Sequence, residues 1–211
     1  MPRFLYFAYG SNLLAERLAA RCPSANPLGP ATLAGRRLVF EAKSFDGSGK
    51  ATLVAGADDD VVHGRLYDID LADRPALDRA EGADQDPPVY RRHDDLEVLG
   101  ADGLPVTGVS VYLAREATAL LPPWDWYRAL IVAGGMQAGL PAGHVAALAV
   151  TPALADVLPQ RKTRRAALEI LRAAGFPELA RACATDEEIE ALSPSLDEVA
   201  ERAVAEAIAY V

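Results

Sequence analysis

A turn near the start of the chain is the stretch of this sequence best suited to binding chemistry. The apolar run Phe4–Tyr9 breaks at Gly10, the small polar pair Ser11 and Asn12 follows, and an amphipathic run begins at Leu13. This pattern predicts a buried strand, a tight turn and the start of a helix. Backbone N–H groups at such a turn lack intrahelical partners, so they can bind an anion or an oxyanion. A plain strand-to-helix connection, with Ser11 or Asn12 as its cap, fits the same residues.

Glu81 is the second feature whose place in the sequence suits chemistry. It ends a helix predicted over Leu71–Glu81, and the residues Ala76, Leu77 and Ala80 before it are apolar. The negative end of the helix dipole disfavours a carboxylate, and an apolar setting would favour its protonated form. A glutamate that exchanges a proton near neutral pH can act as a general acid or base. The alternative is a glutamate that faces solvent at an ordinary helix end.

The composition argues against some functions. The chain has 211 residues, of which 51% are hydrophobic and 24% are charged, and its formal net charge is −9. This size allows one globular domain with a substantial appendage. A negative chain lacks the basic excess that binding to a phosphate backbone requires, so we expect no nucleic-acid partner. The short basic cluster Arg161–Arg165 fits better as the solvated start of a helix.

Cysteine and histidine usage predicts neither a disulfide framework nor a metal site. Cys22 and Cys183 lie far apart, and the three histidines are scattered without the spacing of metal ligands. The apolar run at the N-terminus is too short for a secretory signal, and no run has the length of a membrane span. We therefore expect a cytoplasmic protein with no membrane partner.

The elements that must position the turn and Glu81 are short strands with helices between them. Apolar runs separated by turn signals predict strands at Phe4–Tyr9, Ala31–Ala42, Ala51–Ala55, Val61–Ile69, Val89–Leu99 and Val106–Ala114. Pro27–Pro30 is predicted to be a loop. Helices are predicted over Leu13–Arg21, Leu71–Glu81, Trp124–Ala138 and Thr163–Ala174. About six strands with short turns favour an α+β fold, in which a closed or nearly closed sheet carries helices on its outside.

Helix-end signals and glycines add detail to this arrangement. Asp70 is the predicted N-cap of the helix that ends at Glu81, and Gly82 is the predicted left-handed residue after it. The pair Gly134 and Gly135 weakens the helix that contains it. We therefore predict that another backbone approaches closely there.

The last third of the chain differs in composition from the rest. From about Thr151 it is rich in Ala, Leu, Glu and Arg, so we predict a domain at residues 1–150 and a helical C-terminal extension at 151–211. Capping-box patterns at Thr185–Glu188 and Ser195–Glu198 predict helix starts in this extension.

Four segments resemble the γ-glutamylcyclotransferase family, in the order and at the spacing of that family. FAYGSNLLAERLAARCPSA (Phe7–Ala25) resembles the opening of these enzymes, and LDRAEG (Leu77–Gly82) is similar to their catalytic-glutamate segment. VYRR (Val89–Arg92) and WYRALIVAGGMQAGLP (Trp126–Pro141) continue the match. The resemblance covers the predicted first domain and leaves the C-terminal extension outside.

The resemblance implies a compact mixed β-barrel of about six strands with flanking helices. It implies an enzyme that needs no metal or organic cofactor and cyclises a γ-glutamyl compound to 5-oxoproline and a free amine or amino acid. Glu81 would be the acid–base residue. Main-chain N–H groups of the turn would bind the glutamyl part of the substrate. The residues that the resemblance assigns to substrate binding are Tyr9, Gly10, Ser11, Asn12 and Leu13, with Tyr90 and Tyr127 as candidates to orient the substrate or as plain core aromatics.

Two alternatives stay open. The substrate could be a γ-glutamylamine, with the same glutamyl site and a different pocket for the leaving group. The fold could instead be a non-catalytic interaction module with the helical extension as its partner surface, although an intact Glu81 beside an intact turn speaks against lost catalysis. We expect a monomer or a homodimer. The loop Ala83–Pro88 could form a lid, and Arg91 and Arg92 fit surface or structural roles.

Overall fold

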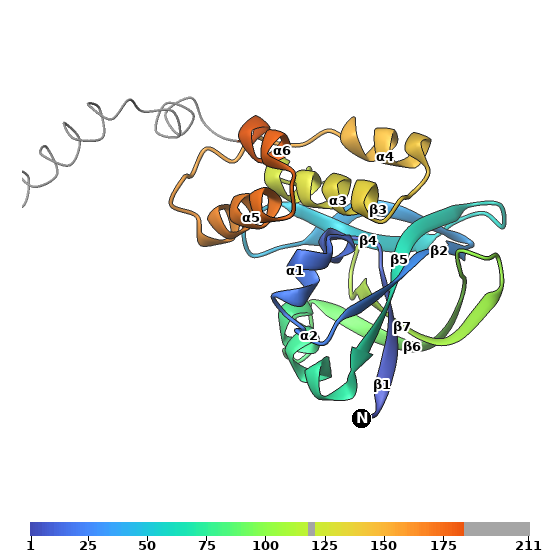
Figure 1. Cartoon of the computed structure of the whole chain (residues 1–211). Coiled ribbons are helices and arrows are strands. Elements are labelled where there is room, and N and C mark those ends of the chain that lie inside the picture. The colour runs from blue at the N-terminus through green and yellow to red at the C-terminus, as the bar shows by residue number, and fades with distance from the viewer. Residues whose placement is uncertain (118–120, 184–211) are drawn as a thin grey trace, which may run out of the picture.

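Five strands close into a barrel, and helices from the second half of the chain cover one side of it (Figure 1). The computed structural model describes residues 1–117 and 121–183. The barrel strands run in the order β1-β5-β2-β6-β7, and a parallel pairing of β7 with β1 closes the barrel. They are β1 (Arg3–Ala8), β2 (Asn26–Ala34), β5 (Val61–Asp70), β6 (Tyr90–Leu99) and β7 (Pro105–Ala114). The strands β3 (Arg36–Lys43) and β4 (Gly49–Ala55) form a separate two-stranded sheet.

The first strand, β1, is paired along both of its edges. It pairs antiparallel with β5, where Tyr6 faces Tyr67, and parallel with β7, where Tyr6 faces Ser110. Paired on both sides, the apolar run is buried as predicted, and Phe7 has no exposed surface. The prediction of a closed sheet with helices outside is confirmed. The barrel itself has five strands rather than six, because β3 and β4 pair only with each other.

Two predictions for the region before β4 are wrong. The single strand expected at Ala31–Ala42 is divided between β2 and β3 at Gly35, whose φ of +68° turns the chain. The loop expected at Pro27–Pro30 belongs to β2, whose pairing with β5 shifts register between Pro27 and Gly29. Such an irregularity tolerates prolines that a regular central ladder would exclude. Pairing with β5 therefore outweighs the local turn signals.

The helices differ from the predictions mainly at their ends. They are α1 (Ala15–Ala19), α2 (Arg74–Glu81), α3 (Asp125–Gln137), α4 (Ala142–Ala149), α5 (Lys162–Ala173) and α6 (Pro177–Ala182), with 3₁₀ turns η1 (Ser11–Leu13) and η2 (Leu71–Asp73). The helix predicted from Leu13 starts later, because Leu14 is extended between η1 and α1. Asp70 does not cap its helix, since its carboxylate pairs with Arg3. Gly82 is left-handed as predicted, with a φ of 64°.

The close approach predicted at the glycine pair of α3 is confirmed. A Cβ atom on Gly134 would lie 2.4 Å from the backbone nitrogen of Leu14. The missing side chain lets α3 pack directly on the chain after the turn, where Leu13 and Leu14 are fully buried. This contact fixes the turn that ends β1 against the longest helix of the described residues.

The helices α5 and α6 share the core of α3. Ala167, Leu168 and Leu171 of α5 belong to the same buried cluster as the apolar side of α3. The basic start of α5 is only partly solvated, contrary to the prediction, because Arg164 is fully buried and donates to the Cys183 carbonyl at 2.7 Å. The division of the chain at residue 150 stays a prediction.

Some predictions fall outside the described residues. The two capping-box segments, at 185–188 and 195–198, both lie in the part of the sequence that the structure does not describe. Within 1–117 and 121–183, no helix combines the length and the apolar character needed to cross a membrane.

Candidate active site

A small pocket lies where β1 ends, and we call it the tyrosine pocket. It brings together seven of the eight residues that the sequence analysis assigned to a site, and Leu13 is the exception. Leu13 is fully buried, and its backbone N–H donates to the Gly10 carbonyl at 2.9 Å. The sequence analysis missed three lining residues, Tyr6, Ala51 and Tyr112. The complete lining consists of Tyr6, Tyr9, Gly10, Ser11, Asn12, Ala51, Glu81, Tyr90, Tyr112 and Tyr127.

The turn carries unpaired backbone donors beside this pocket. Neither Ser11 nor Asn12 caps η1 with its side chain, so the interpretation of this stretch as a capped connection is wrong. The Ser11 hydroxyl instead accepts a hydrogen bond from Arg17 Nε at 3.2 Å. The backbone N–H groups of Ser11 and Asn12 have no hydrogen-bond partner within the described residues. Free N–H groups at the start of a helical turn are suited to binding an anion.

Glu81 reaches the pocket from the last residue of α2. Its Oε1 accepts hydrogen bonds from Asn12 Nδ2 at 2.9 Å and from Arg21 Nη1 at 2.7 Å. Its side chain is 16% exposed, so the alternative of a glutamate facing solvent does not hold. The apolar setting expected from the preceding helix residues is also wrong, because a guanidinium and an amide hold the carboxylate. A charged partner and a hydrogen-bond donor fix the position of Oε1.

The same arginine fixes the orientation of the Asn12 amide. Arg21 Nη1 donates to Asn12 Oδ1 at 3.0 Å. A guanidinium can only donate, so the amide oxygen must face Arg21. The amide nitrogen then faces both Glu81 and Tyr6, and it donates to the Tyr6 hydroxyl oxygen at 3.0 Å. Tyr6, Asn12, Arg21 and Glu81 therefore form one connected network.

Three of the five tyrosines that line the pocket donate their hydroxyl protons to protein acceptors. Tyr9 donates to the backbone carbonyl of Tyr112. Tyr90 donates to the carbonyl of Ala51 at 2.7 Å, and Tyr112 donates to Asp78 Oδ1 at 2.7 Å. The role in orienting the substrate predicted for Tyr90 stays a prediction, and it would have to use the acceptor capacity of that oxygen.

The other two tyrosines only accept hydrogen bonds from the protein. Tyr6 accepts from Asn12, and Tyr127 accepts from the Ala51 backbone N–H at 3.2 Å. Neither hydroxyl proton has an acceptor among residues 1–117 and 121–183. Burial raises the pKa of Tyr6 well above its ordinary value, with the charge of Glu81 adding to the effect. Burial also raises the pKa of Tyr127 to about 12, so both hydroxyls keep their protons at neutral pH.

Two basic residues, Arg17 and Lys50, lie near the tyrosine pocket. Burial, followed by the nearby charge of Arg21, lowers the pKa of Arg17 to about 9. Lys50 lies 4.8 Å from the ring centroid of Tyr127 and pairs with Asp46 at 2.7 Å. Cationic groups near a half-open pocket favour an anionic ligand.

Comparison with known proteins identifies the family. The family model described as gamma-glutamyl cyclotransferase, AIG2-like, matches residues 6–128. The human gamma-glutamylcyclotransferase is 32% identical over 144 residues, which are 65% of this chain and 73% of that protein. The mouse protein of the same name is 32% identical over 145 residues, with the same two shares. The chain belongs to the gamma-glutamyl cyclotransferase, AIG2-like family.

The barrel is shared with solved structures of the family. A structure of a gamma-glutamyl cyclotransferase is 27% identical, covers 82% of this chain and 99% of its own, and superimposes with a TM-score of 0.70. The chain is accordingly an enzyme of the gamma-glutamyl cyclotransferase, AIG2-like family. The resemblance noted in the sequence is thereby confirmed, whereas the roles of single residues stay predictions.

The structure also shows the two arginines and the loop that the sequence analysis singled out near Glu81. Arg92 is structural, because its Nη1 binds Asp78 Oδ1 at 2.6 Å, and Arg91 is exposed. The loop Ala83–Pro88 is closed at its base by the Val89 N–H, which donates to the Gly82 carbonyl at 2.9 Å. Its suggested role as a lid stays a prediction.

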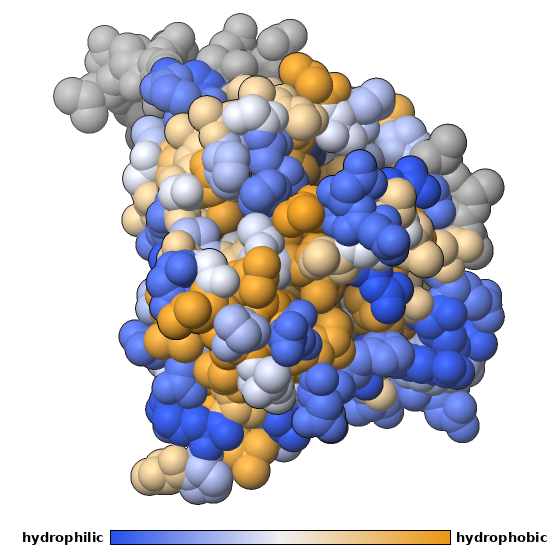
Figure 2. All heavy atoms as spheres, turned by 90° about the vertical axis from the view of Figure 1, so that its right-hand side faces the viewer, coloured by the Kyte–Doolittle hydropathy of each residue, from blue (hydrophilic) through white to orange (hydrophobic). Residues whose placement is uncertain are grey.

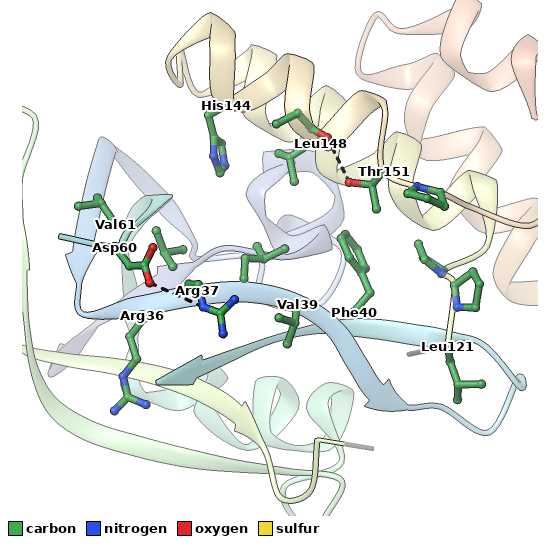
Figure 3. A pocket seen from close by; sticks show the side chains of 16 residues that line it. Arg36, Arg37, Val39, Phe40, Asp60, Val61, Leu121, His144, Leu148 and Thr151 are labelled. Atoms are coloured by element: carbon green, nitrogen blue, oxygen red, sulfur yellow. Dashed lines mark hydrogen bonds and ion pairs between the residues drawn. The ribbon is translucent and has the colours of Figure 1, made fainter. Parts of the chain in front are cut away.

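A second and larger cavity lies away from Glu81. On the face seen in Figure 2, apolar side chains gather in the middle and hydrophilic ones surround them. A cavity of about 650 Å³ lies between β3 and α4, and Figure 3 shows His144 and Leu148 pointing from α4 toward β3 across this space. The only ion pair within its lining joins Arg37 and Asp60 at 3.6 Å, as far as the described residues go. We call this space the larger cavity.

Proposed function

We propose that this protein is a cyclotransferase that converts a γ-glutamyl compound to 5-oxoproline and a free amine, with Glu81 as general base and then general acid. One observation carries the proposal. The Glu81 carboxylate lies in the tyrosine pocket and contacts Asn12, and the backbone N–H groups of Ser11 and Asn12 lack partners in the described part of the chain. The family supports this reaction class, since its curated relatives are named gamma-glutamylcyclotransferase.

Glu81 has one anchored carboxylate oxygen and one available for proton transfer. Oε1 accepts from Asn12 and Arg21, whereas Oε2 has no hydrogen-bond partner among the described residues. A free α-amine has a pKa of roughly 8, so it must lose a proton before its nitrogen can attack the γ-carbonyl. In our proposal the amine is neutral when it attacks, and Oε2 takes the proton that its nitrogen loses as the ring forms and then gives that proton to the departing nitrogen. Proton transfer of this kind typically accelerates a reaction about 10²–10⁴-fold.

The turn would hold the glutamyl part of the substrate in a bent conformation. In our proposal the N–H groups of Ser11 and Asn12 bind its α-carboxylate, and Gly10 has no side chain to block the approach. The attack is intramolecular because the amine and the γ-carbonyl belong to one molecule, and a bent conformation brings these two groups together. Well-oriented reactions of this kind reach effective molarities of about 10⁵–10⁸ M. The proposed reaction needs no cofactor.

A product screen with the purified full-length protein tests the proposal. γ-Glutamyl amino acids, γ-glutamyl peptides and γ-glutamylamines are each incubated with the protein, and 5-oxoproline and the released amine are measured by mass spectrometry. We expect the two products in equal amounts, and the same rate after dialysis against EDTA. The leaving group with the highest kcat/KM then decides between an enzyme for γ-glutamyl amino acids or peptides and one for γ-glutamylamines.

Two results would overturn the proposal. Release of free glutamate in place of 5-oxoproline would mean hydrolysis by water rather than cyclisation. A protein that forms no product and gains no thermal stability from 5-oxoproline would fit the non-catalytic interaction module. Glu97→Gln is the matched control for a Glu81→Gln variant, because the Glu97 side chain is exposed on β6.

A further inference from the structure

We propose that Tyr6 is a further catalytic residue, whose hydroxyl donates a hydrogen bond to the γ-carbonyl oxygen of the substrate as that oxygen becomes negatively charged. The inference rests on the proposed function and adds a residue to the site predicted from the sequence. It depends on where the hydroxyl protons of the tyrosine pocket can point.

The direction of the Tyr6 hydroxyl bond follows from the residues around it. Arg21 is only a donor, so it holds the oxygen of the Asn12 amide at 3.0 Å and turns the amide nitrogen toward Tyr6. The Tyr6 oxygen therefore accepts a hydrogen bond. Its proton must point elsewhere, and it has no acceptor within residues 1–117 and 121–183. A buried hydroxyl donor without a partner is costly, which favours a ligand that accepts from it.

The neighbouring tyrosines differ in this respect. Tyr9, Tyr90 and Tyr112 line the same pocket, but each donates its proton to a carbonyl or a carboxylate of the protein. Tyr127, like Tyr6, has a hydroxyl proton without an acceptor in the described residues, and its oxygen accepts from the Ala51 N–H. Tyr6 alone of the five shares a hydrogen-bond partner with Glu81. The Tyr6 oxygen and Glu81 Oε1 lie 3.0 Å and 2.9 Å from the same Asn12 nitrogen.

This shared partner places Tyr6 beside the reacting carbon. Glu81 must reach both the attacking amine and the leaving nitrogen, and both are bonded to the γ-carbon during the reaction. The γ-carbonyl oxygen is bonded to the same carbon. A donor next to the acid–base carboxylate therefore lies within reach of that oxygen, which is where a catalytic site needs a preorganised donor.

Each step balances with Tyr6 in this role. The amine nitrogen bonds to the γ-carbon, an electron pair of the carbonyl moves to the oxygen, and Glu81 takes the amine proton. The carbonyl then re-forms as the bond to the leaving nitrogen breaks, and Glu81 returns the proton to that nitrogen. Tyr6 keeps its own proton throughout, and burial together with the charge of Glu81 holds its pKa well above the ordinary value.

The variant Tyr6→Phe tests the inference because it removes the hydroxyl and keeps the ring. We expect kcat to fall about 10²–10³-fold, as is typical when one oxyanion donor is lost, with little change in KM. The affinity for 5-oxoproline should also change little, because the ring carbonyl oxygen of the product carries no negative charge. The control is Tyr67→Phe, because Tyr67 does not line the tyrosine pocket and its hydroxyl donates to the Leu13 carbonyl at 3.0 Å. This control should lower the melting temperature and leave kcat near the wild-type value.

A second measurement does not depend on how Tyr6→Phe folds. In a crystal structure of the Glu81→Gln variant with a γ-glutamyl compound, the γ-carbonyl oxygen should lie within hydrogen-bond distance of the Tyr6 hydroxyl. A folded Tyr6→Phe variant with wild-type kcat, or a carbonyl oxygen bound elsewhere, would overturn the inference. The proposed function fails separately, if the wild-type protein releases no 5-oxoproline.

Discussion

The tyrosine pocket and the larger cavity are built in opposite ways. The larger cavity encloses about 650 Å³ between β3 and α4, and most of its lining is apolar. The tyrosine pocket is much smaller, but it is lined by Glu81, the turn and five tyrosine rings. The larger of the two spaces is therefore not the candidate site. Here the connected hydrogen bonds from Asn12 and Arg21 to Glu81 mark the candidate site.

The packing around the two spaces explains why polar groups are held in place in the tyrosine pocket and not in the larger cavity. The turn is pressed against α3 at Gly134, where a Cβ atom would lie 2.4 Å from the Leu14 backbone nitrogen. Tight packing on rigid elements holds polar groups in one geometry, as an active site requires. In α4, by contrast, His144 faces the larger cavity, and its buried Nε2 has no hydrogen-bond partner in the described residues.

Among variants of the two regions, Gly10→Val in the tyrosine pocket is expected to lower kcat/KM the most. A Cβ atom on Gly10 would lie 3.4 Å from both the Tyr127 oxygen and the Ala51 side chain, so the added methyl groups would enter the tyrosine pocket. We expect kcat/KM to fall by about 10²-fold or more, because displaced reacting groups lose that much rate. Ser11→Ala removes one neutral acceptor and should cost at most about tenfold. Oxoproline release by the two variants measures the difference.

The matched control for Gly10→Val lies in the other region. A Cβ atom on Gly143 of α4 would meet nothing within 4 Å, so Gly143→Val should leave kcat/KM near the wild-type value. Equal losses from Gly10→Val and Ser11→Ala would mean that the Ser11 side chain, and not the backbone, binds the substrate. A large loss from Gly143→Val would contradict the assignment of chemistry to the tyrosine pocket alone.

A smaller effect, on stability only, is expected at the larger cavity. Burial lowers the pKa of His144, and the ring of His63, 4.9 Å away between centroids, lowers it further. Below about pH 6.5 the unfolded chain then binds a proton at this histidine more readily than the folded protein does, so stability falls as the pH drops. Arg37 and Asp60 line the same cavity and pair with each other at 3.6 Å.

Thermal melts of His144→Asn check this expectation. Between pH 7.5 and pH 5.5 the melting temperature of the variant should fall less than that of the wild-type protein. At each pH the two proteins should release oxoproline at the same rate. An equal loss of melting temperature in both proteins would remove His144 as the source. A changed rate would mean that the larger cavity also affects the reaction, which would contradict the contrast drawn between the two spaces.

The parts of the site that follow from local sequence could be predicted. The apolar run with its glycine break gave β1 and the turn, and Gly82 marked the end of the helix that carries Glu81. Tyr6 was not predicted, because a tyrosine inside an apolar strand has the pattern of a core residue. Its free proton depends on Asn12 and Arg21, which meet it only after folding. The Arg21 contact to Glu81 joins residues 60 positions apart, so no local pattern contains it.

The fold shows the same limit. Hairpins with clear turns, such as β6 and β7, were predicted close to their observed ends. The division of β2 from β3 at Gly35 was not predicted, because a single glycine with no second turn residue beside it also occurs inside strands, at bulges. The extension of β2 over Pro27 and Gly29 depends on β5, which supplies the pairing from more than thirty positions later in the chain. Contacts between distant strands therefore decided what local signals could not.

The most direct test of the account is the rate of oxoproline release by Glu81→Gln, measured in single turnovers with the best γ-glutamyl substrate. Glutamine keeps the size of the side chain and can still contact Arg21 through its amide oxygen, but it cannot take the amine proton. We predict a loss of at least about 10²-fold with the melting temperature retained, and no loss for Glu97→Gln. Undiminished oxoproline release by a folded Glu81→Gln variant would contradict the account.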